Sequence, residues 1–182
     1  MIARPQAMTA EAFDAFALLP ENRERRLEWI DGEMTELVSN DTLSNVTSRL
    51  MARLEVYVTD HDLGYTTGPD GGYIIQGNRL IPDGAFMPKA HLAKPSGLAY
   101  NPVAPALVVE VLSPTDHPEE VQAKVGLYLD AGIGVWLADP EARSLTVYTP
   151  GQGARLLRRE DTLDGGDILP GFTLPLSKVF AE

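Results

Sequence analysis

One acidic residue, Glu110, lies inside an otherwise apolar run, residues 106–112. The continuous apolar character of this run predicts a strand that is buried on both faces of a sheet. A carboxylate there is costly unless it is paired with a cation, protonated or bound to a metal ion. For Glu110 taken alone, a structural ion pair or a strand-end carboxylate that reaches water is the more ordinary explanation. The residues expected near Glu110 therefore indicate whether its role is structural or catalytic.

The first companion is Asp83, which follows Pro82 at the start of another predicted strand, residues 83–87. A Pro-Asp pair alone indicates only a turn. At the end of a strand, however, Asp83 can lie at a sheet edge close to Glu110. Two carboxylates that converge from adjacent strands form a hard-oxygen site suited to Mg²⁺ or Mn²⁺.

The second companion is Lys124, on a predicted helix over residues 118–130. The apolar face of that helix contains Val121, Val125 and Tyr128, and helical spacing places Lys124 on the same face. A lysine on such a face either extends to solvent or meets buried anions. Because the helix directly follows the Glu110 strand, we expect it to pack back over the sheet and bring Lys124 to the two carboxylates.

Two acids and a lysine around a metal ion suit the hydrolysis of phosphodiesters. A metal ion binds a phosphate oxygen and lowers the pKa of a bound water molecule. The lysine can orient that water or stabilise developing negative charge. Glu28 is a further candidate, as an additional ligand or a partner of the ligands, because its predicted hairpin is expected to join the same sheet. The predicted catalytic residues are thus Asp83, Glu110, Lys124 and Glu28, with Asp83 and Glu110 as metal ligands.

Other kinds of catalytic site have weaker support in the sequence. The three histidines, His61, His91 and His117, lack the spacing of a zinc site, although His117 precedes the predicted helix and could approach the acids. The glycine-rich residues 68–72 are not followed by the Gly-Lys-Ser/Thr of a phosphate-binding loop, and they indicate a plain turn. The absence of cysteine excludes disulfides, thiolate catalysis and thiolate metal sites.

The elements that must position these residues follow from periodicity and turn signals. The patterns predict an N-terminal β-hairpin around Asp31-Gly32, further strands, and helices on either side of them. Helices are expected over residues 9–19, 42–61 and 118–130, and residues 113–116 supply capping chemistry for the last of them. Strands are expected within residues 26–38 and over residues 65–67, 72–76, 83–87, 106–112, 135–139, 144–149 and 154–159. Residues 89–105 are expected to form a loop. This mixture predicts an α/β fold with a central mixed β-sheet flanked by helices.

Length and composition limit the class of protein. The 182 residues fit a single domain over residues 1–182, of which residues 1–8 are expected to be flexible. No apolar run is long enough to span a membrane, and no signal peptide is recognisable, so we expect a cytoplasmic protein. Apolar residues 169–180 and open strand edges favour a homodimer.

The net charge of −11 opposes non-specific binding to nucleic acids, which depends on basic residues that meet phosphates. Arginines cluster at Arg23, Arg25 and Arg26, and again at Arg155, Arg158 and Arg159. Both clusters are interpreted as solvated surface.

Several of these segments together resemble the Uma family of candidate restriction endonucleases. The resemblance extends from about residue 9 to residue 180, and the motifs occur in the family's order. They are residues 27–33 (LEWIDGE), 81–83 (IPD), 108–115 (VVEVLSPT), 124–132 (KVGLYLDAG), 135–140 (VWLADP) and 169–172 (LPGF).

The resemblance implies a restriction-endonuclease-like fold of the PD-(D/E)XK superfamily, with Asp83 as the first acid and Glu110 as the second. The lysine of that pattern normally stands two residues after the second acid, where this chain has Leu112. In the Uma family the lysine's role is thought to move to the following helix, which matches Lys124. The activity implied is Mg²⁺-dependent cleavage of DNA.

One departure from the family keeps a second interpretation open. Family members often carry a histidine at the start of the long helix, whereas residues 39–44 contain none. Basic residues are also sparse for a DNA-cleaving enzyme. The alternative is a non-catalytic, dimeric interaction module that retains the nuclease fold.

Overall fold

The computed structural model describes residues 8–181, so nearly all of the segment expected to be flexible lies outside the described residues. Its helices are α1 (Ala10–Ala17), α2 (Asp41–Asp60), α3 (Pro118–Asp130) and a short 3₁₀ helix, η1 (Leu176–Lys178). The three predicted α-helices are therefore confirmed. Among residues 8–181, no helix is long and apolar enough to cross a membrane.

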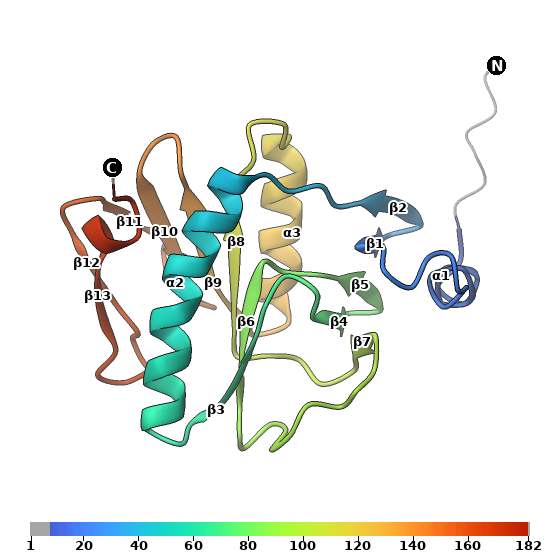
Figure 1. Ribbon diagram of the computed structural model, residues 1–182, viewed down its shortest axis with the longest axis horizontal. Coiled ribbons are helices and arrows are strands. Elements are labelled where there is room, and N and C mark those ends of the chain that lie inside the picture. The colour runs from blue at the N-terminus through green and yellow to red at the C-terminus, as the bar shows by residue number, and fades with distance from the viewer. Residues whose placement is uncertain (1–7, 182) are drawn as a thin grey trace.

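A six-stranded mixed sheet forms the centre of the molecule, in the order β11-β10-β9-β8-β6-β3 (Figure 1). Its strands are β3 (Gly64–Thr67), β6 (Gly84–Pro88), β8 (Leu107–Val111), β9 (Gly134–Asp139), β10 (Ser144–Tyr148) and β11 (Arg155–Arg158). Strands β8 and β9 are parallel, and the other neighbours are antiparallel. The predicted central mixed sheet is confirmed, with the Glu110 strand β8 in its interior.

Helices α2 and α3 cover opposite faces of this sheet (Figure 1). Side chains alternate between the two faces along a strand. Val109 accordingly packs in the cluster that contains Leu50 and Leu54 of α2, whereas Val108 packs with Val125 of α3. The strand is buried on both sides, which explains its continuous apolar run.

A second, five-stranded sheet holds the N-terminal hairpin, in the order β2-β1-β5-β4-β7. Its strands are β1 (Leu27–Ile30), β2 (Glu33–Glu36), β4 (Gly72–Ile75), β5 (Asn78–Leu80) and β7 (Tyr100–Asn101). Asp31 and Gly32 both have positive φ, 48° and 96°, as the predicted tight turn requires. The expectation that the hairpin joins the central sheet was wrong, because β1 pairs with β2 and β5. The sequence also gave no sign of β5, or of β7 within the expected loop.

The C-terminal segment folds back onto the core. Strands β12 (Thr162–Asp164) and β13 (Thr173–Pro175) form a small antiparallel pair. Leu169, Phe172 and Leu174 are buried in the same cluster as α2. The apolar tail is therefore part of the core, and it lends no support to a dimer.

The start of α3 differs in detail from the expected capping. The helix begins at Pro118, and its N-cap residue is His117, whose side chain makes no capping hydrogen bond. Asp116 instead accepts a hydrogen bond from the backbone N–H of Ser113, at 2.8 Å. Its side chain thereby stabilises the turn between β8 and α3 rather than the helix itself.

Candidate active site

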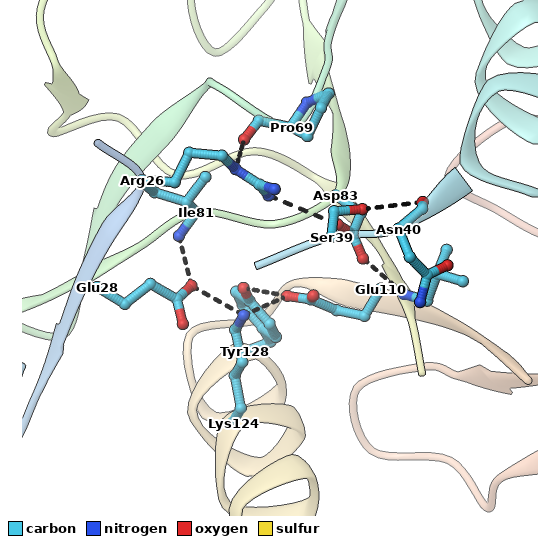
Figure 2. A network of polar contacts seen from close by, with 11 residues as sticks. Arg26, Glu28, Ser39, Asn40, Pro69, Ile81, Asp83, Glu110, Lys124 and Tyr128 are labelled. Carbon is cyan, nitrogen blue, oxygen red and sulfur yellow. Dashed lines mark hydrogen bonds and ion pairs between the residues drawn. The ribbon is translucent and has the colours of Figure 1, made fainter. Parts of the chain in front are cut away.

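Lys124 lies between two carboxylates at the junction of the two sheets and α3 (Figure 2). Its Nζ is 2.8 Å from Glu28 Oε1 and 3.0 Å from Glu110 Oε1. The side chains are only 17%, 6% and 14% exposed, respectively. Of the two possibilities for a lysine on a core-facing helix face, the structure thus shows contact with buried anions.

Asp83 reaches the same place from the start of β6. Strand β6 pairs antiparallel with β8, which sets Gly84 opposite Val109. Asp83 Oδ2 accepts a hydrogen bond of 2.8 Å from the backbone N–H of Val111, the residue after Glu110. The strand pairing that the sequence indicated therefore brings the two acids together.

Glu28 comes from the smaller sheet, although it was expected on the central one. Its Oε1 accepts a 2.6 Å hydrogen bond from the backbone N–H of Ile81, as well as the contact from Lys124. Glu28 therefore ties β1, the segment before Asp83 and helix α3 together. With Oε1 used in this way, its observed contacts fit a residue that positions Lys124.

Tyr128 is a member of the cluster that sequence reasoning treated only as an apolar residue. It lies one turn after Lys124 on α3, is fully buried, and donates a 2.7 Å hydrogen bond to Glu110 Oε1. Both donors from α3 thus converge on the same oxygen of Glu110. A buried tyrosine hydroxyl usually has a partner, and this was the available signal.

Arg26 was also misread, because the arginine cluster was assigned to solvated surface. Its Nε donates a 2.7 Å hydrogen bond to the carbonyl oxygen of Pro69, and its Nη2 lies 3.6 Å from Asp83 Oδ1. The signal was strand alternation, since Arg26 stands two residues before Glu28 and shares its side of the strand.

The electrostatics of the site reflect buried negative charge. Burial raises the pKa of Glu110 to about 7, with Asp83 and Glu28 adding to the rise and Lys124 opposing it. Burial also raises the pKa of Asp83, against the hydrogen bond from Val111 and the charges of Lys124 and Arg26. Burial alone would lower the pKa of Lys124, but Glu110 and Glu28 together raise it. The lysine consequently stays charged while the acids repel one another.

These residues line a cavity of about 450 Å³. His117 lines it as well. Its walls are rich in carboxylates, and the only arginine or lysine side chains among its lining residues are Arg26 and Lys124. The carboxylates are Glu28, Asp31, Glu33, Asp83, Glu110, Asp116 and Glu120.

Asp83 and Glu110 are the candidate ligands of a divalent cation. Within residues 8–181, no three His, Asp or Glu side chains are grouped closely enough to hold a metal ion by themselves. Asp83 and Glu110 provide two hard-oxygen donors whose mutual repulsion a cation would relieve. Mg²⁺ is typically held by one or two carboxylates together with water and substrate phosphates. The residues present therefore fit such an ion.

Comparisons with known proteins agree with this architecture. The model of a protein family described as "Uma2: Putative restriction endonuclease" matches residues 11–177. The crystal structure of a "putative nuclease belonging to DUF820" from Anabaena variabilis superposes with a TM-score of 0.82. It is 18% identical, and the match covers 95% of this chain and 97% of that one, which shows a shared fold. No curated protein matches the sequence.

Proposed function

Because the chain belongs to the Uma2 family of putative restriction endonucleases and has the restriction-endonuclease-like fold, we propose that it is a metal-dependent endonuclease that hydrolyses DNA. The observation that carries the proposal is the position of Lys124. Its amine lies 3.0 Å from Glu110, and the next residue in the strand, Val111, donates a backbone hydrogen bond to Asp83. The chain thus has two acids and a lysine together even though Leu112 stands where the lysine of the pattern is usual.

Asp83 and Glu110 are the residues that would hold Mg²⁺ or Mn²⁺. When bound, such an ion makes a water molecule more acidic and neutralises charge on the phosphate. Asp83 is oriented for this by the N–H of Val111 on Oδ2, and Glu110 by Tyr128 and Lys124 on Oε1. These contacts hold both carboxylates without involving the second oxygen of Glu110.

Lys124 supplies a fixed positive charge beside the reacting phosphate. Two carboxylates raise its pKa, so the amine keeps its proton at neutral pH. It therefore stabilises developing negative charge, or orients a water molecule by donating to it, and does not act as a base. Glu28 holds the lysine from the side opposite Glu110.

The direct test is cleavage of plasmid and branched DNA with Mg²⁺, with Mn²⁺ and with EDTA. Wild type should cut only with a metal ion, and Glu110→Ala and Lys124→Met should each abolish cutting. Lys89→Met is a matched control, because Lys89 forms an exposed ion pair with Asp62 and should leave cutting unchanged. Metal-dependent cutting by Glu110→Ala would contradict the proposed site.

A second candidate function, a non-catalytic interaction module, is favoured by the acidic cavity. Seven carboxylates line it beside Arg26 and Lys124, which is unfavourable for a polyanion without added cations. Failure to cleave any nucleic acid, together with failure to bind Mg²⁺ or Mn²⁺ in calorimetry, would support the module.

The homodimer stays a prediction in either case. Strand β2 lies at the edge of its sheet and all four of its residues are exposed, so it offers unpaired backbone groups to a second copy. Light scattering that shows only a monomer at high concentration would contradict it.

A further inference from the structure

Arg26 is hydrogen-bonded at one end of its guanidinium and forms a long ion pair with Asp83 at the other (Figure 2). The carbonyl of Pro69 accepts the hydrogen bond from its Nε at 2.7 Å, which fixes the guanidinium plane. Its Nη2 lies 3.6 Å from Asp83 Oδ1, beyond hydrogen-bond range. Among residues 8–181, the Nη groups donate no hydrogen bond, and the side chain is 20% exposed. The Nη groups of Arg26 therefore keep their hydrogen-bond donors available beside Asp83, at the wall of the cavity.

The other basic side chain in the cavity is already engaged. Lys124 contacts both Glu28 and Glu110. Of the two basic side chains that line the cavity, Arg26 is therefore the one that retains free hydrogen-bond donors. A guanidinium offers five N–H donors in a planar fork that matches two phosphate oxygens, and one is used by Pro69.

We propose that Arg26 binds non-bridging oxygens of the DNA backbone phosphate that enters the cavity beside Asp83. This inference rests on the proposed function and specifies how the substrate is held. The competing explanation is that Arg26 serves only as the counter-ion of Asp83. A counter-ion would be expected in direct hydrogen-bond contact, whereas the Nη2 of Arg26 lies 3.6 Å from Asp83, its Nε is anchored on Pro69, and the residue lines the cavity.

The test measures binding of a fluorescently labelled DNA duplex in the cleavage-deficient Glu110→Gln background. Anisotropy titrations over a potassium chloride series, at a fixed low Mg²⁺ concentration, compare this parent with variants that also carry Arg26→Ala or Arg26→Lys. Loss of a charged phosphate contact should weaken binding at least about tenfold. The slope of log affinity against log salt should become shallower by up to about one, because one fewer counterion is released. Arg26→Lys should keep the slope and lose part of the affinity, since a lysine keeps the charge but not the fork.

Arg23→Ala is the matched control, because Arg23 is exposed and its Nε donates to the carbonyl of Leu18. It should change neither affinity nor slope. If Arg26→Ala keeps the affinity and slope of the parent, Arg26 is a counter-ion only, and this inference fails while the nuclease proposal stands. If Arg26→Ala does not fold, a shallower slope in Arg26→Lys refutes the inference. If the parent binds no duplex at any salt concentration, the proposed function fails first, and this inference with it.

Discussion

Replacement of Lys124 by methionine should destabilise the protein more than a typical loss of an ion pair. The change removes the one amine that contacts both Glu28 and Glu110. The three side chains are at most 17% exposed, so the cost of leaving a buried charge unpaired applies, about 3–5 kcal/mol. Lys89→Met is again the control, since Lys89 and Asp62 are 53% and 82% exposed and such pairs contribute about 0–1 kcal/mol.

Urea unfolding followed by circular dichroism measures the difference, with the slope of free energy against urea checked for constancy. The pH dependence gives a second signature. The folded pKa of Glu110 is already raised to about 7, so the native state binds more protons than the unfolded state between about pH 4.5 and 7. This contribution is most favourable below the unfolded pKa and is lost as the pH rises through the folded value. Because Lys124 opposes the rise, its removal moves the folded pKa of Glu110 higher still.

The deficit of Lys124→Met should therefore be larger at pH 8 than at pH 6. Saturating Mg²⁺ should stabilise this variant more than wild type, because a cation binds only the folded site and would there replace the positive charge that the substitution removes from beside the carboxylates. Equal stabilities of Lys124→Met and Lys89→Met at every pH would refute the reasoning. They would mean that Lys124 extends to solvent and that the acids repel one another less than their burial implies.

Three further predictions follow from the site and the core. The affinity for Mn²⁺, measured by calorimetry, should rise as the pH increases from 6 to 8, because the pKa of Glu110 is about 7 and a protonated carboxyl is a poor ligand; a flat profile would exclude Glu110 as a ligand. Tyr128→Phe should shift that profile to higher pH, because the tyrosine hydroxyl lowers the pKa of Glu110. The same change should lower the free energy of unfolding by about 1.5–3 kcal/mol in thermal or urea unfolding, and an unmoved profile would assign Tyr128 to packing alone. Leu54→Ala, in the fully buried face of α2, should lower the free energy of unfolding in urea by about 2–5 kcal/mol without moving the Mn²⁺ profile. A smaller loss would indicate that the core collapses into the space left by the leucine side chain.

The elements that carry Asp83, Glu110 and Lys124 were predictable because each is encoded locally. The apolar run of β8 and the spacing of α3 are patterns within one segment, and the short connection between them limits where the helix can pack. The face of Lys124 on its helix therefore led to the observed contact with Glu110. Whether these residues perform the chemistry stays a prediction.

The parts that were missed depend on tertiary pairing. Strand β5 is three residues long and includes two polar residues, Asn78 and Arg79, so no alternation marks it. Without β5, nothing in the sequence separates the hairpin from the central sheet. The position of Arg26 was missed for a related reason, since its anchor, Pro69, is 43 residues away in the chain.

The placement of Lys124 on a helix makes the site sensitive to helical phase. Each residue of an α-helix advances the side-chain direction by about 100°, so a single insertion between Pro118 and Lys124 would rotate the amine away from Glu28 and Glu110. An insertion of about one full turn would restore the direction while shifting the amine along the axis. Position 112, by contrast, holds a leucine and has no proposed catalytic role. Other apolar residues are therefore expected to be tolerated at position 112, which follows β8, whereas the length of the segment from the end of β8 to Lys124 is expected to stay fixed.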